Sequence, residues 1–368
     1  MPIRMPMNNR YAVIMAGGRG ERFWPQSRLH RPKQLLPIVG DKPMIAQTVD
    51  RLKGIVPPER IFIITNQEQR AGTVAACPGV PASQIVGEPV GRDTAAAVGL
   101  AVMLVSRLDP TASLALLPAD AAIHDDAGFR RALESAFVVA GRAPRLVTVG
   151  ILPTGPATGY GYIHKGARDE DASGLPVFDV RRFVEKPDLE KAREYVASGE
   201  FLWNAGMFVW SVPTIVAAFE KNAADIWKAL GSIGVSLDRG KSLDATLREI
   251  YPLIPKISVD YAILEKADNV SCVPAVFDWD DVGEWPAIAR HDKPDASGNI
   301  LRGDAVVLDG RDNIVVSENG HLLAVLGVHD LVVVHTPDAT MVIPKSRAQD
   351  VKKLVQHIAT KPAWSARV

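Results

Sequence analysis

Between residues 11 and 150, short and almost continuously apolar runs alternate with longer amphipathic stretches, and this alternation constrains the fold more than any other feature. The runs YAVIM, RIFIIT, SLALLPAD and RLVTVGI are typical of strands that are buried on both faces. The stretches KPMIAQTVDRLK, RDTAAAVGLAVMLVSRL and AGFRRALESAFVVAGR carry helical periodicity and begin with polar residues. Together they predict an α/β fold with a mixed, mostly parallel sheet flanked by helices. Ligands of such a sheet gather where its strands end.

The pattern of predicted strands and helices changes near residue 292. Up to residue 290, strands are predicted in GYGYIHK, PVFDVRRFVEKP and LWNAGMFVW, and helices in LEKAREYVAS, PTIVAAFEKNAADIWKAL and SVDYAILEKA. After the turn-rich DKPDASGN, short apolar runs follow at a spacing of roughly ten residues, before a final helix in SRAQDVKKLVQHIA. We therefore predict two domains, residues 1–291 and a small β module with its terminal helix at 292–368. The module is either barrel-like or a short solenoid.

Composition excludes several classes of protein. The 368 residues contain 42 Lys and Arg and 42 Asp and Glu, so there is no overall basic field to attract nucleic acid or an anionic membrane. The two cysteines, Cys77 and Cys272, cannot form a disulfide framework and indicate a reducing compartment. No apolar run is long enough to span a bilayer, and MPIRMPMNNR resembles a short disordered lead rather than a signal peptide. A cytoplasmic location is expected.

The loop after the first predicted strand, AGGRGERFWPQSRLHRPKQLL, combines glycines with cations. It does not match the dinucleotide fingerprint, because Phe23 occupies the position of the third glycine, and it lacks the P-loop pattern. A Gly-Gly-x-Gly turn can still wrap a polyphosphate with its backbone N–H groups, while Arg22 and Lys33 reach the same anion. The alternative is a tight turn with solvated arginines.

Several motifs in order then resemble one family. After AGGRGERFWPQSR and RPKQLL come EPVGRDTAAA, PAD, TGYGYI, FVEKP, NAGMF, SVDYAILEK and WDDVGEW. This series resembles the sugar-1-phosphate nucleotidyltransferases and, through Trp24, PKQ and WDDVGEW, the mannose-1-phosphate guanylyltransferases. The resemblance covers nearly the whole chain. It implies a Rossmann-like, GT-A-like catalytic domain followed by a short left-handed β-helix.

The resemblance implies a reaction of GTP with mannose 1-phosphate that gives GDP-mannose and pyrophosphate, with Mg²⁺ as cofactor. The sugar phosphate is already anionic and attacks the α-phosphorus without a general base, so the site must align two anions and neutralise their charge. We expect no isomerase domain after the β module, and therefore a single activity. The resemblance implies a homodimer. The alternatives are a guanylyltransferase for another sugar 1-phosphate, such as a manno-heptose, and a non-catalytic paralogue that senses the nucleotide sugar.

Two carboxylates are the candidates for the metal. Asp120 ends the strand SLALLPAD, and the resemblance points to Asp281 in WDDVGEW, with Asp280 a close competitor. Mg²⁺ typically takes one or two carboxylates together with substrate phosphates and water. The alternative is that Asp120 caps the following turn and Asp281 the helix beginning near Gly283.

The remaining assignments follow the family motifs residue by residue. Glu88 would accept from the N1–H and 2-amino group of guanine, although an exposed loop glutamate is the commoner case. NAGMF fits a sugar pocket or a glycine bulge in a buried strand. The catalytic set is Arg22, Lys33 and Lys186; the nucleotide set is Ala16, Gly17, Gly18, Gly20, Glu88, Arg92, Asp93 and Thr94; the sugar-phosphate set is Gly159, Tyr160, Glu185, Asn204 and Gly206.

Two departures from the family pattern bear on specificity. Asp93 stands where the family has Asn, and it either caps the helix that follows or alters base preference. Ala205 stands where the family often has Ser, which removes one possible contact with the sugar.

Overall fold

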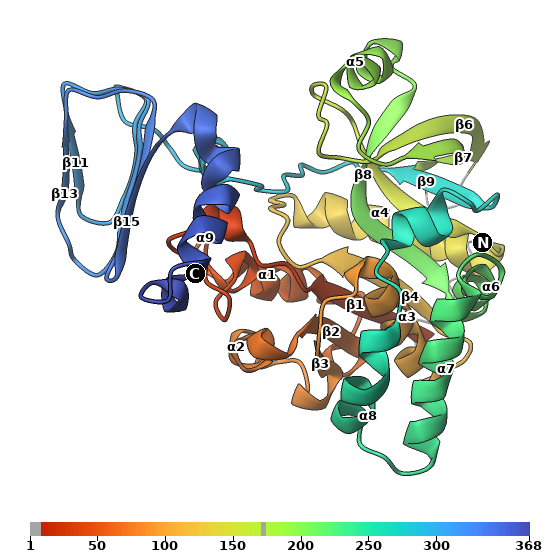
Figure 1. Cartoon of the computed structure of the whole chain (residues 1–368). Helices are drawn as coiled ribbons and strands as arrows, with labels where there is room; N and C mark the ends of the chain where they lie inside the picture. Colours follow the sequence, from red (N-terminus) through yellow and green to blue (C-terminus); the bar gives the residue numbers. More distant parts are fainter. Residues whose placement is uncertain (1–8, 171–173) are drawn as a thin grey trace.

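The computed structural model describes residues 9–170 and 174–368, so most of the predicted N-terminal lead lies outside the described residues. Its centre is a nine-stranded mixed sheet in the order β3-β2-β1-β4-β8-β5-β9-β7-β6 (Figure 1). One half of the sheet is parallel and is built from β1 (Arg10–Ala16), β2 (Ile61–Asn66), β3 (Ile85–Glu88) and β4 (Ser113–Pro118). These strands end at one edge, and the loop rich in glycines and cations follows β1 there.

The other half of the sheet is mixed. β8 (Phe201–Ser211) is antiparallel to both β4 and β5 (Leu146–Ile151), and β5 is parallel to β9 (Val270–Pro274). β7 (Pro176–Val184) and β6 (Tyr162–Glu170) complete the sheet in antiparallel pairings. The α/β prediction with a mixed sheet is confirmed.

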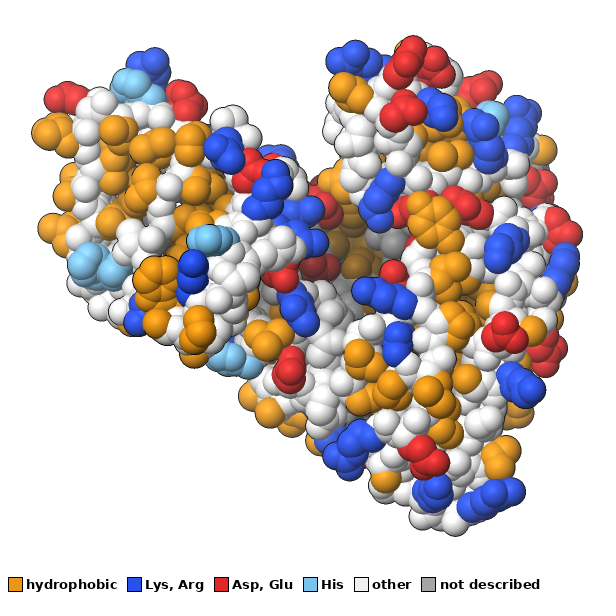
Figure 2. Space-filling view, viewed as in Figure 1, with side chains coloured by type: hydrophobic (Ala, Val, Ile, Leu, Met, Phe, Trp, Pro, Cys, Tyr) orange, Lys and Arg blue, Asp and Glu red, His pale blue; other side chains and the backbone are white. Residues whose placement is uncertain are grey.

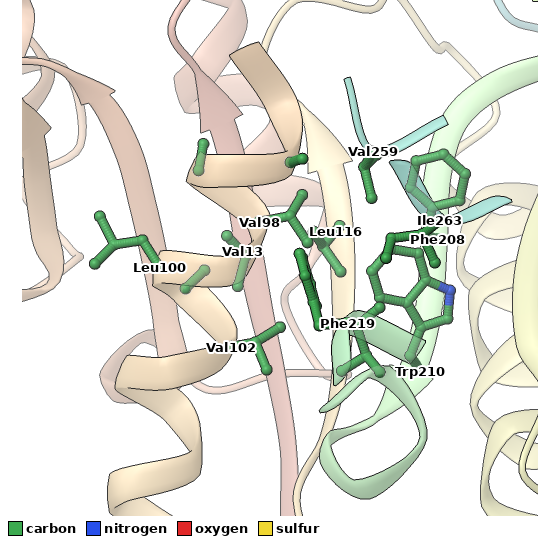
Figure 3. Packing of buried hydrophobic residues seen from close by; sticks show 14 of the residues in the cluster. Val13, Val98, Leu100, Val102, Leu116, Phe208, Trp210, Phe219, Val259 and Ile263 are labelled. Carbon is green, nitrogen blue, oxygen red and sulfur yellow. The ribbon is translucent and has the colours of Figure 1, made fainter. Parts of the chain in front are cut away.

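Helices cover both faces of the sheet because successive strand residues point to opposite sides. Val13 packs in one apolar cluster with α3 (Asp93–Leu108), α6 (Val212–Asn222) and α7 (Ala224–Asp238), as Figure 3 shows for part of it. Its neighbour Ile14 packs in a second cluster with α1 (Met44–Arg51) and α4 (Asp126–Arg142). The shorter helices are α2 (Arg70–Ala76), α5 (Leu189–Ser198) and α8 (Leu243–Ile250).

Two predicted helices differ in the structure. The stretch PTIVAAFEKNAADIWKAL is divided at Ala223, whose φ of −147° interrupts the helix between α6 and α7. The stretch SVDYAILEKA forms only one π-helical turn, Asp260–Leu264, rather than a regular α-helix. Single π turns are frequent at functional sites, and this one lines a pocket described below.

The C-terminal module is a short β-solenoid, not a barrel (Figure 1). β10 (Ile300–Arg302), β12 (Ile314–Ser317) and β14 (Leu331–Thr336) stack in parallel, and β15 (Ala339–Pro344) pairs antiparallel to β14. A second sheet joins β11 (Ala305–Leu308) to β13 (Leu323–Leu326). Asp309, Asp312 and Asp330 have positive φ at the corners, a conformation that Asp and Asn tolerate better than other side chains.

A third apolar cluster joins this module to the loop after β1. It contains Phe23, Trp24 and Trp285 together with buried residues of β10, β12 and β14 and of the terminal helix α9 (Val351–Ala359). On α9, Val351 and Val355 are buried as expected, whereas Leu354 is 37% exposed. Within the described residues no helix is both long and apolar enough to cross a membrane. The domain boundary at residue 292 stays a prediction.

Candidate active site

The loop after β1 is fixed by side chains that bind its carbonyl groups. The amide of Gln34 donates to the carbonyls of Ala16 (2.7 Å) and Gly18 (3.0 Å), and the Ser27 hydroxyl donates to the carbonyl of Gly20 (2.8 Å). Gly20 has a φ of +60°, and a Cβ there would lie 2.4 Å from Cβ of Lys33. Only glycine therefore allows the loop to pass this close to Lys33.

Lys33 links the loop to the two chain segments that carry the predicted metal carboxylates. Its side chain is buried, and its ammonium donates to Oδ2 of Asp120 (2.9 Å), to the Asp120 carbonyl (3.0 Å) and to the Asp281 carbonyl (2.6 Å). The predicted direct contact of Lys33 with nucleotide phosphate stays a prediction. In the structure Lys33 neutralises the carboxylate pair and fixes the spacing of the two chain segments that carry it.

Asp280 and Asp281 differ in their hydrogen-bond partners. Asp280 accepts from Arg290 (2.5 Å and 2.7 Å), from His291 (2.9 Å) and from the Val282 amide (2.8 Å), and these hydrogen bonds hold its pKa far below the usual range despite burial. The carboxylate of Asp281 instead accepts from the Tyr160 hydroxyl (2.7 Å), and burial raises its pKa. Asp280 is therefore fully engaged, and Asp281 is the carboxylate that lines the pocket.

The carboxylate oxygens of Asp120 and Asp281 are suitable ligands for Mg²⁺. Asp120 and Asp281 line one pocket, and neither carboxylate caps a helix in the way the sequence left open. Hard oxygen ligands on two carboxylates suit Mg²⁺, whose remaining positions are filled by phosphate oxygens and water. Within residues 9–170 and 174–368 no cluster of three His, Cys, Asp or Glu side chains could hold a metal by itself, so an ion here would depend on substrate oxygens as well.

Arg22 lines the same pocket as the two carboxylates and is exposed there. Its charge acts on Glu284, but it makes no ion pair within 4.0 Å with another described residue, so its guanidinium can still approach an anion. Arg19 has a side chain that is 63% exposed and lies 3.9 Å from Glu21, so it is a largely solvated residue of this loop. The hollow between the C-terminal module and the main domain is edged with basic and acidic side chains (Figure 2).

Glu88 ends β3 beside the glycine loop and is buried, not the exposed loop glutamate of the alternative. Its Oε1 accepts from the Tyr251 hydroxyl (2.5 Å), and its Oε2 would lie 3.3 Å from a Cβ at Gly17. Burial raises the pKa of Glu88 to about 7; the Tyr251 hydrogen bond lowers it and the charge of Asp93 raises it. Glu88 lines both pockets that open beside the glycine loop.

The start of α3 lies in the same region. Asp93 has a φ of +64°, and its carboxylate accepts from the Thr94 amide (2.8 Å), the residue that follows it, while it also lines the pocket of Glu88. The start of α3 has no side-chain cap hydrogen bond, so the predicted cap is not formed. Thr94 lines that pocket and accepts from the Val259 amide (2.9 Å). Arg92 donates instead to the carbonyl of Pro252, and neither it nor the buried Ala16 is among the residues that line these pockets.

Asn204 and Gly206 face the pocket from β8. The Asn204 amide donates to Oδ1 of Asp260 (3.1 Å), and its oxygen accepts from the amide of Gly206 (3.1 Å), which has a φ of +67°. Ala205 between them is buried in the cluster on the opposite face of the sheet. The expectation that Ala205 costs a sugar contact is therefore wrong, because alternate residues of a strand point to opposite faces.

Asp260 is a site residue that the sequence analysis missed. It lies in the π turn, lines the pocket of Asn204, and has a pKa raised to about 6, mainly by burial and then by the charge of Glu185. The motif SVDYAILEK marked the segment, but a helical pattern does not indicate which polar residue faces the ligand.

Glu185 and Lys186 lie beside this pocket. The Lys186 ammonium is 2.6 Å from Oε1 of Glu185, and Lys186 has a φ of +47°. The glycine that approaches them closely is Gly161, where a Cβ would lie 2.6 Å from Oε2 of Glu185. Gly159 is exposed and has no such neighbour, and Tyr160 turns toward Asp281.

This arrangement of a glycine loop, paired carboxylates and cations at the ends of parallel strands defines the class of the nucleotidyltransferases. The Nucleotidyl transferase family model matches residues 11–297, and a model described as the MannoseP isomerase/GMP-like beta-helix domain matches residues 303–358.

Similar proteins of known name indicate which branch of the family the chain belongs to. An Escherichia coli mannose-1-phosphate guanylyltransferase is 38% identical over 348 residues, covering 94% of this chain and 73% of the relative. The alginate biosynthesis protein AlgA of Pseudomonas aeruginosa is 38% identical over 354 residues, covering 94% and 71%. A crystal structure titled mannose-1-phosphate geranyltransferase, from Thermus thermophilus, superimposes with a TM-score of 0.84 at 36% identity, over 95% of this chain and 99% of the other. The chain therefore belongs to the nucleotidyl transferase enzymes, in the branch of the mannose-1-phosphate guanylyltransferases.

Proposed function

We propose that this enzyme transfers GMP from GTP to α-D-mannose 1-phosphate, giving GDP-mannose and pyrophosphate. The relatives named mannose-1-phosphate guanylyltransferase support the substrate pair. The observation that carries the chemistry is the joint contact of Lys33 with Asp120 and with the Asp281 segment, at the mouth of the glycine loop.

The proposed mechanism needs no proton transfer. An oxygen of the sugar phosphate attacks the α-phosphorus of GTP, the bond from that phosphorus to the bridging oxygen of the β-phosphate breaks, and pyrophosphate leaves. Bound Mg²⁺ would neutralise charge on the phosphates, with Asp120 and Asp281 as its protein ligands. Arg22 would stabilise negative charge on the nucleotide, and Lys186 would position the sugar phosphate.

Base and sugar are assigned to separate parts of the site. The buried carboxylate of Glu88 suits a pair of N–H donors, which guanine presents and adenine lacks. Asn204, Asp260 and Glu185 together offer amide and carboxylate groups for sugar hydroxyls. No observation favours a manno-heptose over mannose, because Ala205 faces away from the pocket.

The test is pyrophosphate release by the purified protein with Mg²⁺, with each common nucleoside triphosphate crossed against mannose, glucose and manno-heptose 1-phosphates. Release confined to GTP and mannose 1-phosphate is expected. Release with another pair would reassign the substrate, and binding of GDP-mannose without release from any pair would favour the sensing paralogue.

We also propose a homodimer. The outer sheet of the C-terminal module exposes Val306, Leu308 and Leu326, which supply apolar area for contact with a second copy. Sedimentation equilibrium of the full chain is expected to give twice the chain mass. Monomeric behaviour at micromolar concentration would contradict this proposal.

A further inference from the structure

One cation in the phosphate pocket comes from the C-terminal module. Lys352, near the start of α9, lines the pocket that contains Gly20, Arg22 and the two carboxylates. No motif that pointed to the nucleotidyltransferases includes it, and it lies more than two hundred residues along the chain from Asp120.

Packing holds α9 against the loop after β1. Val351 and Val355 are buried in the same cluster as Phe23 and Trp24, and the helix contacts the turn Glu21–Phe23 (Figure 1). The side chain of Gln349 hydrogen-bonds Glu284 in the WDDVGEW motif. Lys352 follows the buried Val351 directly, so this packing holds the backbone that carries Lys352 beside the pocket that it lines.

The cations in this pocket differ in whether a protein carboxylate already pairs with them. Lys33 is engaged by Asp120 and the Asp281 carbonyl. Arg22 and Lys352 make no ion pair with any described residue, whereas the adjacent Lys353 is 2.7 Å from Asp350. Two unpaired cations that share a pocket with two carboxylates would attract a metal-bound polyphosphate more strongly than a neutral ligand.

The base and the sugar are already assigned to other parts of the site, so one group of the substrates remains for the pocket of Lys352. The base is assigned to Glu88 and the sugar to Asn204 and Asp260, in two adjoining pockets that are both lined by Gly17 and Glu88 and do not include Lys352. The remaining part of a nucleoside triphosphate is its β- and γ-phosphates, which become the leaving pyrophosphate. We propose that Lys352 binds these phosphates, so that the C-terminal module completes the active site; this rests on the proposed nucleotidyl transfer.

The test compares Lys352→Met with Lys353→Met, a matched change one residue away, and with Lys352→Arg. Binding of inorganic pyrophosphate to the full chain in the presence of Mg²⁺ is measured by titration calorimetry. Loss of one charge-assisted contact predicts that Lys352→Met weakens binding about tenfold, with little change in Lys353→Met and partial recovery in Lys352→Arg. The same ratio is expected in the KM for pyrophosphate of the reverse reaction, with the KM for GDP-mannose unchanged.

The outcomes separate this inference from the proposed function. Equal pyrophosphate affinity in wild type and Lys352→Met, with GDP-mannose still formed, would overturn the role of Lys352 and leave the function intact. Lys352-dependent pyrophosphate binding in a protein that forms no GDP-mannose would support the site and overturn the proposed substrates. Equal loss of every ligand, together with a lower melting temperature, would also overturn the inference, because it indicates a structural role.

Discussion

The ammonium of Lys33 lies 2.9 Å from Oδ2 of Asp120, across 87 positions of sequence. This contact joins the loop after β1 to the end of β4, two adjacent parallel strands. The same ammonium donates to the Asp281 carbonyl, so one buried cation fixes three segments that meet at the ends of the strands. A buried ammonium without these partners would be costly, which is why the three segments are held together.

Replacing Lys33 by Met should therefore lower kcat/KM about a hundredfold or more, because it removes a fixed positive charge beside the reacting phosphates. It should also raise the pKa of Asp281, which the Lys33 charge lowers. Steady-state kinetics measure the first effect, and the pH dependence of kcat/KM measures the second. Lys42→Met, which breaks the exposed pair with Asp50, is the control. A folded Lys33→Met enzyme within twofold of wild type would contradict the assignment.

Tyr160→Phe should weaken metal binding about tenfold, since partners that orient a ligating carboxylate commonly contribute this much. The variant loses the hydroxyl that donates to Asp281, and the pKa of that carboxyl rises further, so protons compete better with the metal. Mn²⁺ titration followed by electron paramagnetic resonance, at the same saturating concentration of GTP for every variant, measures the affinity. Tyr162→Phe removes a hydroxyl bonded to the Ala157 carbonyl and should leave metal affinity unchanged. Equal affinities in the two variants would refute the prediction.

Binding of GTP should strengthen as the pH rises from about 6 to about 8. The carboxyl of Glu88, with a pKa of about 7, becomes ionised over this range, and only its ionised form accepts two N–H donors. Calorimetric titration of GTP across the range measures the change. ATP carries the same triphosphate and corrects for phosphate ionisation. In Glu88→Gln the extra pH dependence of GTP over ATP should disappear; if it persists, another group reads the base.

The contact between Trp285 and the loop after β1 should be costly to disrupt. Trp285 is fully buried, packs 5.1 Å from Phe23 between ring centroids, and donates to the Trp24 carbonyl (3.1 Å). Trp285→Ala should lower the free energy of unfolding by about 3 to 5 kcal/mol. It should also raise the KM for GTP, because Phe23 and Trp24 belong to the phosphate loop. Denaturant unfolding and kinetics measure both, with the half-exposed Trp364→Ala as control. A stability loss with unchanged KM would mean that the loop holds its shape without this contact.

Much of the fold followed from local patterns. Strands β1, β2, β4 and β5 were predicted because burial on both faces imposes a continuous apolar run, a property of the residues themselves. The sequence did not predict the break between α6 and α7 or the π turn at Asp260. Helical periodicity is nearly the same on both sides of a single distorted residue, so the pattern does not show the distortion.

The candidate site divides in the same way. Residue types at motif spacing indicated the glycine loop, Lys33, Asp120 and the WDDVGEW carboxylates before any contact was known. Three features required the tertiary structure. Asp281 rather than Asp280 lines the pocket, the Tyr160 hydroxyl donates to a carboxylate, and Ala205 faces the core.

The sequence by itself determined the class of the enzyme and the segments that meet at its site, because these depend on residue type and local spacing. Only the tertiary structure decided how the charges are partnered: Lys33 with Asp120, Asp280 with Arg290, and Lys352 with no described residue. The physical reason is that an electrostatic interaction depends on the distance and burial of two groups in space, and separation along the chain carries no information about either.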